Sequence, residues 1–217
     1  MKGARPIKAS KGKNYRGKFP SRKVGQMIYW ESLLERDYIR ILEFDPEVKY
    51  FESQPLVIPY LYQGRRHEYF PDFKVITRAD KIKLVEVKPN EFLQKDENRI
   101  KYNVGIQYCE QMGWTYHVAT EDNIRRGYLQ SNLKKILEVD FDEIKTKINN
   151  AIIRYLNQVG PVQFLTVINN LKEINHQELY IHIYYLIYTH QIFTELIDLP
   201  LSENSILEIN NEGGYRC

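Results

Sequence analysis

The amino-acid sequence predicts an α/β protein in which a mixed sheet flanked by helices is followed by a smaller α+β domain. Two observations support this prediction. Between residues 25 and 138, segments rich in β-branched and aromatic residues alternate with segments of helical periodicity. From residue 139 to residue 217, three helical segments precede two short strand-like segments. A chain of 217 residues is long enough for two such domains.

Residues 1–24 predict a basic, flexible arm ahead of both domains. They contain nine lysines and arginines and no acidic residue, whereas the whole chain has a net charge of only +3. Such an arm cannot bury a core, and we expect it to order on an anionic surface such as nucleic acid phosphate. A solubilising tail is the alternative. The predicted DNA contacts are Lys11, Lys13, Arg16, Lys18, Arg22 and Lys23.

Cysteine usage and hydropathy exclude several classes of protein. The two cysteines, Cys109 and Cys217, have no partner at zinc-site spacing, so neither a disulfide scaffold nor a structural metal is predicted. No apolar run follows the basic N-terminus, and no stretch of about 18 uncharged apolar residues occurs. We therefore expect a soluble protein in a reducing, cytoplasmic setting.

The first element of the larger domain is a predicted helix over residues 26–44. Apolar residues recur there at near-helical spacing, and Asp45-Pro46 ends the pattern. Glu31 and Glu35 are one helical turn apart, so both could lie on one face, and only one of them needs to point toward the sheet. Strands over residues 48–51 and 56–62 and a turn at residues 63–64 are predicted next.

The centre of this domain is a predicted β-hairpin over residues 68–89 with a polar turn at residues 77–80. Side chains alternate between the two faces of a strand, which places Glu86 and Lys88 on the same face. In the first arm Pro71 lacks a backbone donor and interrupts the strand. Asp72 can therefore lie across from Glu86 and Lys88.

Two carboxylates and a lysine on a rigid hairpin are typical of metal-dependent phosphodiester hydrolysis. Carboxylate oxygens are hard ligands for Mg²⁺, which keeps several waters and binds substrate phosphate at its remaining positions. We expect one or two Mg²⁺ ions, with Mn²⁺ tolerated, and a lysine that orients the attacking water or stabilises the charged phosphate. The alternative is a surface hairpin on which Glu86 and Lys88 form a solvated ion pair.

The pattern Pro71-Asp72 followed by Glu86-Val87-Lys88 resembles the signature of the PD-(D/E)xK nuclease superfamily, which implies a restriction-endonuclease-like fold. With the stretches at residues 35–44 and 51–56, it resembles the N-terminal domain of TnsA, the endonuclease subunit of heteromeric transposases. This resemblance covers about residues 26–137.

The resemblance implies an active site made of a helix glutamate, a strand aspartate and a lysine, which fall on Glu35, Asp72 and Lys88. The family can carry a glutamine where this chain has Glu86, so Glu86 is a further candidate ligand. Glu35, Asp72 and Glu86 are thus the predicted metal ligands, and Lys88 is predicted to position the attacking water.

The remaining elements complete the two domains. A helix over residues 92–112 that stops at Gly113, a strand over 115–119 and a helix over 123–137 end the nuclease domain, and Cys109 is expected in its core. The smaller domain has predicted helices over residues 141–157, 160–171 and 177–190 and strands over residues 192–196 and 206–209. This order of elements is winged-helix-like. The TnsA family carries such a domain after its nuclease domain, so the order of the two domains also resembles TnsA.

The third helix of the smaller domain lacks a cluster of Lys or Arg, so we favour docking to a partner protein over reading of DNA. Tyr184, Tyr185 and Tyr188 are the predicted partner contacts, because exposed tyrosines are frequent anchors of protein interfaces. Packing in the core is the alternative for these tyrosines and for His182.

The resemblance implies a Mg²⁺-dependent bacterial DNA endonuclease that cuts the 5′ strands at transposon ends. A DDE-type transposase and an ATPase regulator that docks on the C-terminal region would be its partners. One rival is a stand-alone restriction or repair nuclease. The other is a non-catalytic DNA- or protein-binding module, against which the intact set of Glu35, Asp72, Glu86 and Lys88 argues.

Overall fold

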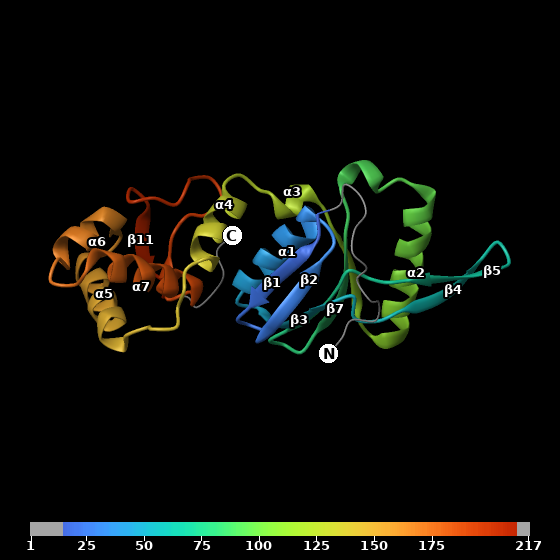
Figure 1. Cartoon of the computed structure of the whole chain (residues 1–217), viewed down its shortest axis with the longest axis horizontal. Helices are drawn as coiled ribbons and strands as arrows, with labels where there is room; N and C mark the ends of the chain where they lie inside the picture. The colour runs from blue at the N-terminus through green and yellow to red at the C-terminus, as the bar shows by residue number, and fades with distance from the viewer. Residues whose placement is uncertain (1–14, 212–217) are drawn as a thin grey trace. The chain divides into compact units, whose positions relative to one another are not determined.

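A computed structural model describes residues 15–211 of the chain (Figure 1). The chain divides into two compact units, and the division falls between Ile124 and Arg125, earlier than the predicted boundary at residues 138–139. Each unit has its own sheet and its own helices.

The first unit is built on a four-stranded mixed sheet with the strand order β3-β6-β7-β8. Neighbouring strands are antiparallel except β7 and β8, which are parallel. Helix α2 connects β7 to β8 and covers the sheet between them, as a parallel crossover requires. The four strands are β3 (Val48–Ser53), β6 (Phe73–Thr77), β7 (Ile82–Val87) and β8 (Thr115–Ala119).

The central hairpin is confirmed as β6 and β7, which pair from Phe73 opposite Val85 to Ile76 opposite Ile82. Its side chains alternate as predicted. Val85 and Val87 pack in one buried cluster, and Leu84 packs in a second cluster on the other face of the sheet. The predicted first arm is shorter than expected, because residues before Phe70 belong to a different ribbon.

Two helices cover the two faces of this sheet. Helix α1 (Leu33–Phe44) buries Leu34, Ile39 and Leu42 against Val85 and Val87. Helix α2 (Asp96–Met112), preceded by the short 3₁₀ turn η1 (Asn90–Phe92), packs on the opposite face. Its end is the predicted one, because Gly113 adopts the left-handed conformation that caps a helix, with φ of 69°.

The predicted helix over residues 26–44 is wrong in its first part, because Gln26–Trp30 forms strand β2. Its partner is β1 (Gly17–Ser21), which lies in the segment predicted to be a flexible arm. A tight turn at Gly25 joins the two strands, and Ile28 is buried between exposed neighbours, which is the period of a strand. The helix begins only after Ser32, whose hydroxyl accepts a hydrogen bond from the Glu35 backbone N–H. Residues 1–14 of the predicted arm lie outside the described residues.

A second hairpin, β4 (Ile58–Tyr62) and β5 (Arg65–Tyr69), extends away from the body of the first unit (Figure 1). Gln63 and Gly64 both have positive φ, which is the geometry of the two-residue turn that matches the twist of a hairpin. Only the base of this ribbon is buried, at Ile58 and Tyr69. We call residues 58–69 the β4–β5 ribbon.

The predicted helix over residues 123–137 is instead two helices, α3 (Glu121–Ile124) and α4 (Leu129–Leu137). The break is at Gly127, which has a φ of +43°. Helix α4 belongs to the second unit because Asn132 donates to the carbonyls of Leu196 and Leu199 and accepts from the Leu201 N–H. These contacts are remote in sequence and could not be read from helical periodicity.

The second unit contains three further helices and a three-stranded antiparallel sheet with the order β10-β11-β9. The predicted two-stranded ribbon is confirmed as β10 and β11, and the short strand β9 adds to its edge. The predicted second helix starts later than expected because β9 takes its first residues. The elements are α5 (Thr146–Val159), β9 (Val162–Gln163), α6 (Phe164–Asn170), α7 (His176–Tyr188), β10 (Ile192–Phe193) and β11 (Ile206–Ile209).

None of the helices within residues 15–211 combines the length and the apolar character that a membrane crossing demands.

Gly105 of α2 sits where the ring of Tyr116 passes under the helix. A Cβ atom at this position would lie 2.3 Å from Cε2 of Tyr116. Gly105→Ala should therefore destabilise the protein by about 1–3 kcal/mol through overpacking, although the same change in an open helix stabilises by about 1 kcal/mol. Urea unfolding measures the difference. The double variant with Tyr116→Ala should recover the ordinary helix preference, and a stabilised Gly105→Ala single variant would contradict the packing.

Candidate active site

The candidate site lies where the central hairpin leaves the sheet. Asp72 directly precedes β6, Glu86 is within β7, and Lys88 directly follows β7. The Lys88 backbone N–H donates to the Ala119 carbonyl at 3.0 Å, which ties this end of the hairpin to β8. Backbone pairing thus holds three different side chains, an aspartate, a glutamate and a lysine, at one edge of the sheet.

Asp72 is fixed by its backbone and by its side chain. Its carbonyl accepts from the Gln54 N–H at 2.8 Å, and its Oδ2 accepts from the Val87 N–H at 2.7 Å. Pro71 precedes it, so no backbone donor is available there for regular pairing. The carboxylate of Asp72 takes over the pairing of the Val87 N–H, and its Oδ1 has no hydrogen bond to any described residue.

Glu86 is almost fully buried, with 4% of its surface exposed, and each of its carboxylate oxygens has a partner. Oε1 lies 3.0 Å from Nζ of Lys88, and Oε2 accepts from the Tyr69 hydroxyl at 2.8 Å. The Tyr69 hydroxyl is also 2.7 Å from the Tyr116 hydroxyl. Glu86 therefore holds the ammonium group of Lys88 in place and is itself held by a tyrosine pair.

Glu35 is in the first turn of α1, and its backbone and carboxylate complete the start of the helix. Its N–H donates to Oγ of Ser32, and its Oε2 accepts from the Glu31 N–H at 2.8 Å. Glu31 itself turns elsewhere, because its carboxylate pairs with Arg16 at 3.8 Å. Of the two predicted acidic positions on this segment, Glu35 is thus the one whose charge reaches the hairpin carboxylates.

Electrostatics show that the three carboxylates lie close to one another. Burial, and then the charges of Glu86 and Glu35, raise the pKa of Asp72 well above its ordinary value, against the opposing Val87 N–H and Lys88. Burial also raises the pKa of Glu35, with Glu31 and Glu86 adding to the effect and hydrogen bonds from Glu31 and Ser32 opposing it. The cluster therefore favours a cation, whose positive charge would lower both pKa values.

Lys88 remains a cation in this setting. Burial alone would lower its pKa, but the carboxylates of Glu86 and Asp72 outweigh that effect and raise the pKa above its ordinary value. A lysine of this kind can stabilise negative charge on a phosphate or orient a water molecule. It is poorly suited to act as a general base, which requires the neutral amine.

Residues 45–121 match the family model described as TnsA-like endonuclease N terminal. This segment is a TnsA-like endonuclease N-terminal domain. The matched range contains Asp72, Glu86 and Lys88 and begins after Glu35. For this segment, the match implies the nuclease activity and the DNA substrate of that endonuclease family. No curated protein matches the chain.

The donor set of the TnsA-like domain fits a hard cation in its chemistry. Oδ1 of Asp72 is a carboxylate oxygen without a hydrogen bond to any described residue, and Glu35 adds a second carboxylate. Mg²⁺ prefers one or two such ligands together with waters and phosphate. Among residues 15–211, no three His, Cys, Asp or Glu side chains are arranged to hold an ion as they stand. For Glu86 to bind an ion, its contact with Lys88 or with Tyr69 would have to break.

Three tyrosines around Glu86 were not predicted as part of the site. Tyr69, Tyr102 and Tyr116 come from β5, α2 and β8, and burial followed by the charge of Glu86 raises the pKa of both Tyr69 and Tyr116. The Tyr102 hydroxyl is buried without a hydrogen-bond partner among the described residues. In the sequence, the only indication of this group is that Tyr69 lies three residues before Asp72.

The predicted basic contacts have different surroundings. Lys11 and Lys13 lie outside the described residues. Arg16 pairs with Glu31, and Lys18 lies over the ring of Tyr29. The ammonium group of Lys23 donates to the carbonyls of Leu42 and Asp45 at the end of α1, and burial lowers its pKa to about 8. Lys23 therefore caps a helix, and its charge is partly withdrawn from solvent.

The three predicted partner tyrosines of the second unit are half-buried and pack against phenylalanines. Tyr185 and Tyr188 contact the ring of Phe141, with ring centroids 5.5 Å apart in both pairs, and Tyr184 contacts Phe164. These contacts account for part of each ring within the chain itself. Docking of a partner through their exposed parts stays a prediction.

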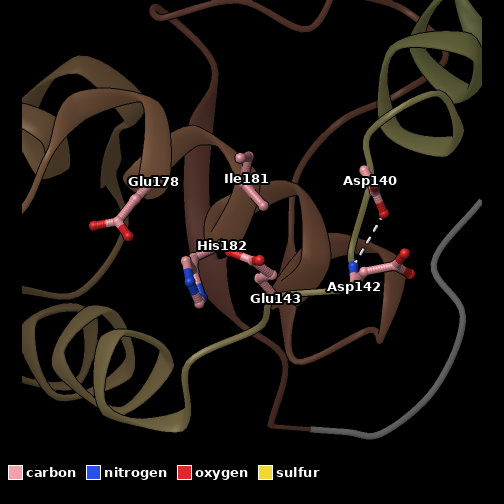
Figure 2. A pocket seen from close by; sticks show the side chains of 6 residues that line it. All are labelled: Asp140, Asp142, Glu143, Glu178, Ile181 and His182. Carbon is pink, nitrogen blue, oxygen red and sulfur yellow. Dashed lines mark hydrogen bonds between the residues drawn. The ribbon is translucent and has the colours of Figure 1, made fainter.

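A pocket of about 330 Å³ in the second unit has an acidic lining (Figure 2). Its acidic side chains come from the segment before α5 and from α7. Burial lowers the pKa of His182 in its wall, and Nδ1 of His182 lies 2.7 Å from Oδ1 of Asn149. Glu178 pairs with the ammonium group of Lys145, and the other carboxylates of the lining disfavour a phosphate group. The lining residues are Asp140, Asp142, Glu143, Glu178, Ile181 and His182.

The Tyr69 hydroxyl can be tested as the group that holds Glu86. Tyr69→Phe keeps the ring in the core but leaves a buried carboxylate oxygen without its donor, which should cost about 1–3 kcal/mol of unfolding free energy. Tyr60→Phe in the adjacent strand is the matched control, because its hydroxyl has no hydrogen bond within the described residues. Equal stability of the two variants in urea would show that the contact between Tyr69 and Glu86 contributes nothing.

Proposed function

We propose that this protein is the metal-dependent DNA endonuclease subunit of a TnsA-like transposase, which cuts the 5′ strands at transposon ends together with a DDE-type transposase. One observation carries the proposal. In this chain with a TnsA-like domain, burial and the charges of Glu86 and Glu35 raise the pKa of Asp72, beside a lysine that is held as a cation. This is a cation site next to a group suited to phosphate.

Glu35 and Asp72 would hold the Mg²⁺ ion. One oxygen of each carboxylate is fixed by a backbone N–H, and Oδ1 of Asp72 is free of hydrogen bonds to described residues. A bound ion of this type supplies Lewis acid stabilisation of the phosphate and lowers the pKa of a water molecule. Because both carboxylates are anchored to backbone, the site is ordered before the ion arrives, which limits the entropy lost on binding.

Lys88 would contact the scissile phosphate or the attacking water. Glu86 fixes the position of the Lys88 ammonium group, so the orientation of its N–H donors is set by a protein side chain and not by solvent. The positive charge stabilises the additional negative charge that develops on the phosphate oxygens in the transition state. Glu86 would act mainly by positioning Lys88, although the prediction that it also binds the ion is untested.

The second unit would be a winged-helix-like docking domain for the transposase or its ATPase regulator. The order α5-β9-α6-α7-β10-β11 and the small antiparallel sheet support this proposal. Helix α7, from His176 to Tyr188, contains no Lys or Arg, and the pocket beside it is acidic. Both features favour a protein partner over a phosphate backbone.

The basic N-terminal segment would add contacts to DNA phosphate. Strand β1 begins at Gly17, so removal of residues 1–23 would also destroy the β1–β2 hairpin. Removal of residues 1–14 is the cleaner change, because it deletes five of the nine positive charges and leaves β1 complete. The contacts proposed for Lys11 and Lys13 can be separated in this way from those of Arg16, Lys18 and Arg22.

Asp72→Ala and Lys88→Ala should each reduce strand cleavage by a factor on the order of 10³ or more, because each removes a group that acts in the transition state. Glu86→Gln should be milder, since an amide oxygen can still accept a hydrogen bond from Tyr69 or Lys88. The measurement is cleavage of a transposon-end duplex with purified partners and Mg²⁺.

Asp80→Asn is the matched control for these variants, because Asp80 is an exposed carboxylate at the far turn of the same hairpin and asparagine tolerates its positive φ. It should cut like the wild type. Cleavage that survives Asp72→Ala would refute the site, and efficient cleavage by the wild type without any partner would favour a stand-alone nuclease.

Divalent metal should stabilise the folded protein, by about 2.7 kcal/mol at a concentration a hundred times the dissociation constant. Asp72→Asn should abolish this response while raising the metal-free melting temperature, because it removes a charge that repels Glu35 and Glu86 but keeps an acceptor for the Val87 N–H. Thermal unfolding with and without Mg²⁺ checks both. A full metal response in Asp72→Asn would exclude Asp72 as a ligand.

A further inference from the structure

The β4–β5 ribbon exposes an unbroken run of side chains. All eight residues from Leu61 to Glu68 are exposed, and Leu61 near the tip has 74% of its surface in solvent. An isolated two-stranded ribbon has little stability of its own, so a projecting ribbon with an exposed apolar residue needs either an anchor or a binding partner. Figure 1 shows it extending past α2 and away from the sheet.

The base of the ribbon is anchored directly to the candidate active site. Ile58 and Tyr69 are buried together with Leu84 and Cys109, which confirms Cys109 as a core residue. The hydroxyl of Tyr69 donates to Glu86, and the next residues of the chain lead to Asp72. Whatever the ribbon binds is therefore placed in a defined position relative to Asp72 and Lys88.

The charge of the ribbon has one sign along most of its length. No acidic residue occurs between residues 53 and 67, and Glu68 is next to the base. The guanidinium groups of Arg65 and Arg66 have neither a hydrogen bond nor an ion pair with any described residue. They are adjacent in an exposed strand, so they point to opposite faces of the ribbon.

Each face combines its arginine with a rigid or apolar surface. Arg65 is opposite Tyr62, on the face where Tyr60 and His67 stack at 5.3 Å between ring centroids. Arg66 is opposite Leu61 on the other face. Two cations on opposite faces of one thin ribbon match a ligand that surrounds the ribbon with negative charge.

We propose that the β4–β5 ribbon enters a groove of duplex DNA beside the cleaved bond, where Arg65 and Arg66 contact phosphates of the two groove walls. This inference rests on the proposed function and deepens it. The major groove admits a two-stranded ribbon, and phosphates flank it on both sides.

The ribbon also sets how far from the cut these contacts lie. Arg65 is four residues from Tyr69, or about 13 Å along an extended strand. This corresponds to about four base pairs of duplex at roughly 3.4 Å per pair. The structure thus assigns to the ribbon the task of holding the flanking duplex while Asp72 and Lys88 act on the backbone.

The test is the salt dependence of duplex affinity for the full chain carrying Arg65→Gln and Arg66→Gln together. The probe is a labelled linear duplex containing a transposon end. Two lost phosphate contacts should reduce the slope of log affinity against log salt concentration by about 1.8. The matched control is Lys81→Gln with Lys83→Gln, which removes two exposed cations of the same unit from the far end of the central hairpin. The slope of the control should differ from that of the wild type by less than about 0.9, the change expected for one phosphate contact.

A ribbon variant with the control's slope and affinity would overturn the proposal, and circular dichroism would confirm that both variants are folded. Loss of binding to the transposase with an unchanged DNA slope would also overturn it, in favour of a protein partner. If the salt slope depends on the ribbon but the wild-type protein does not cleave with partners and Mg²⁺, the endonuclease function is refuted and the ribbon assignment stands. Absence of any wild-type duplex binding would reject both.

Discussion

The buried carboxylate of Glu86 is the group on which the arrangement of the first unit depends. A charge removed from water must be paired and hydrogen-bonded, and Glu86 meets both needs with Lys88 and Tyr69. These two partners belong to different parts of the fold, since Lys88 ends the central hairpin and Tyr69 ends the β4–β5 ribbon. One buried carboxylate thereby fixes the candidate catalytic lysine and the base of the projecting ribbon.

The packing of the tyrosines around Glu86 also explains why position 105 is a glycine. Tyr116 lies against the Tyr69 hydroxyl, and its ring occupies the space that a side chain at Gly105 would need. Helix α2 can approach β8 this closely only because Gly105 lacks a Cβ atom. Close packing of helix on sheet, burial of the tyrosines and orientation of Glu86 are consequently coupled.

The clustering of Glu35, Asp72 and Glu86 destabilises the folded protein as long as no ligand is bound. Burial and mutual repulsion raise the pKa values of Asp72 and Glu35, which means that their charged forms are less stable in the folded state than in water. Perturbed ionisation of this kind concentrates at functional sites. A cation and a phosphate are the ligands that would convert this unfavourable arrangement into a favourable one.

Asp72, Glu86 and Lys88 could be predicted because they depend on local rules. Strand alternation places Glu86 and Lys88 on one face, and Pro71 interrupts the pairing of the first arm next to Asp72. Gln26–Trp30 was misassigned to a helix because the strand that pairs with it, Gly17–Ser21, lies in a segment whose composition suggests an arm. The break between α3 and α4 was missed for a similar reason, since Tyr128 donates to the Ile197 carbonyl far along the chain.

The sequence by itself determined the order of the elements, the central hairpin and the chemistry of its three polar residues, because propensity and alternation act between neighbours in the chain. Only the tertiary structure decided which of Glu31 and Glu35 turns toward the hairpin carboxylates, which tyrosines enclose Glu86, and that the β4–β5 ribbon leaves the sheet. Those outcomes depend on hydrogen bonds and burial between residues that are distant in sequence. Such contacts satisfy buried polar groups whose partners no local pattern reveals.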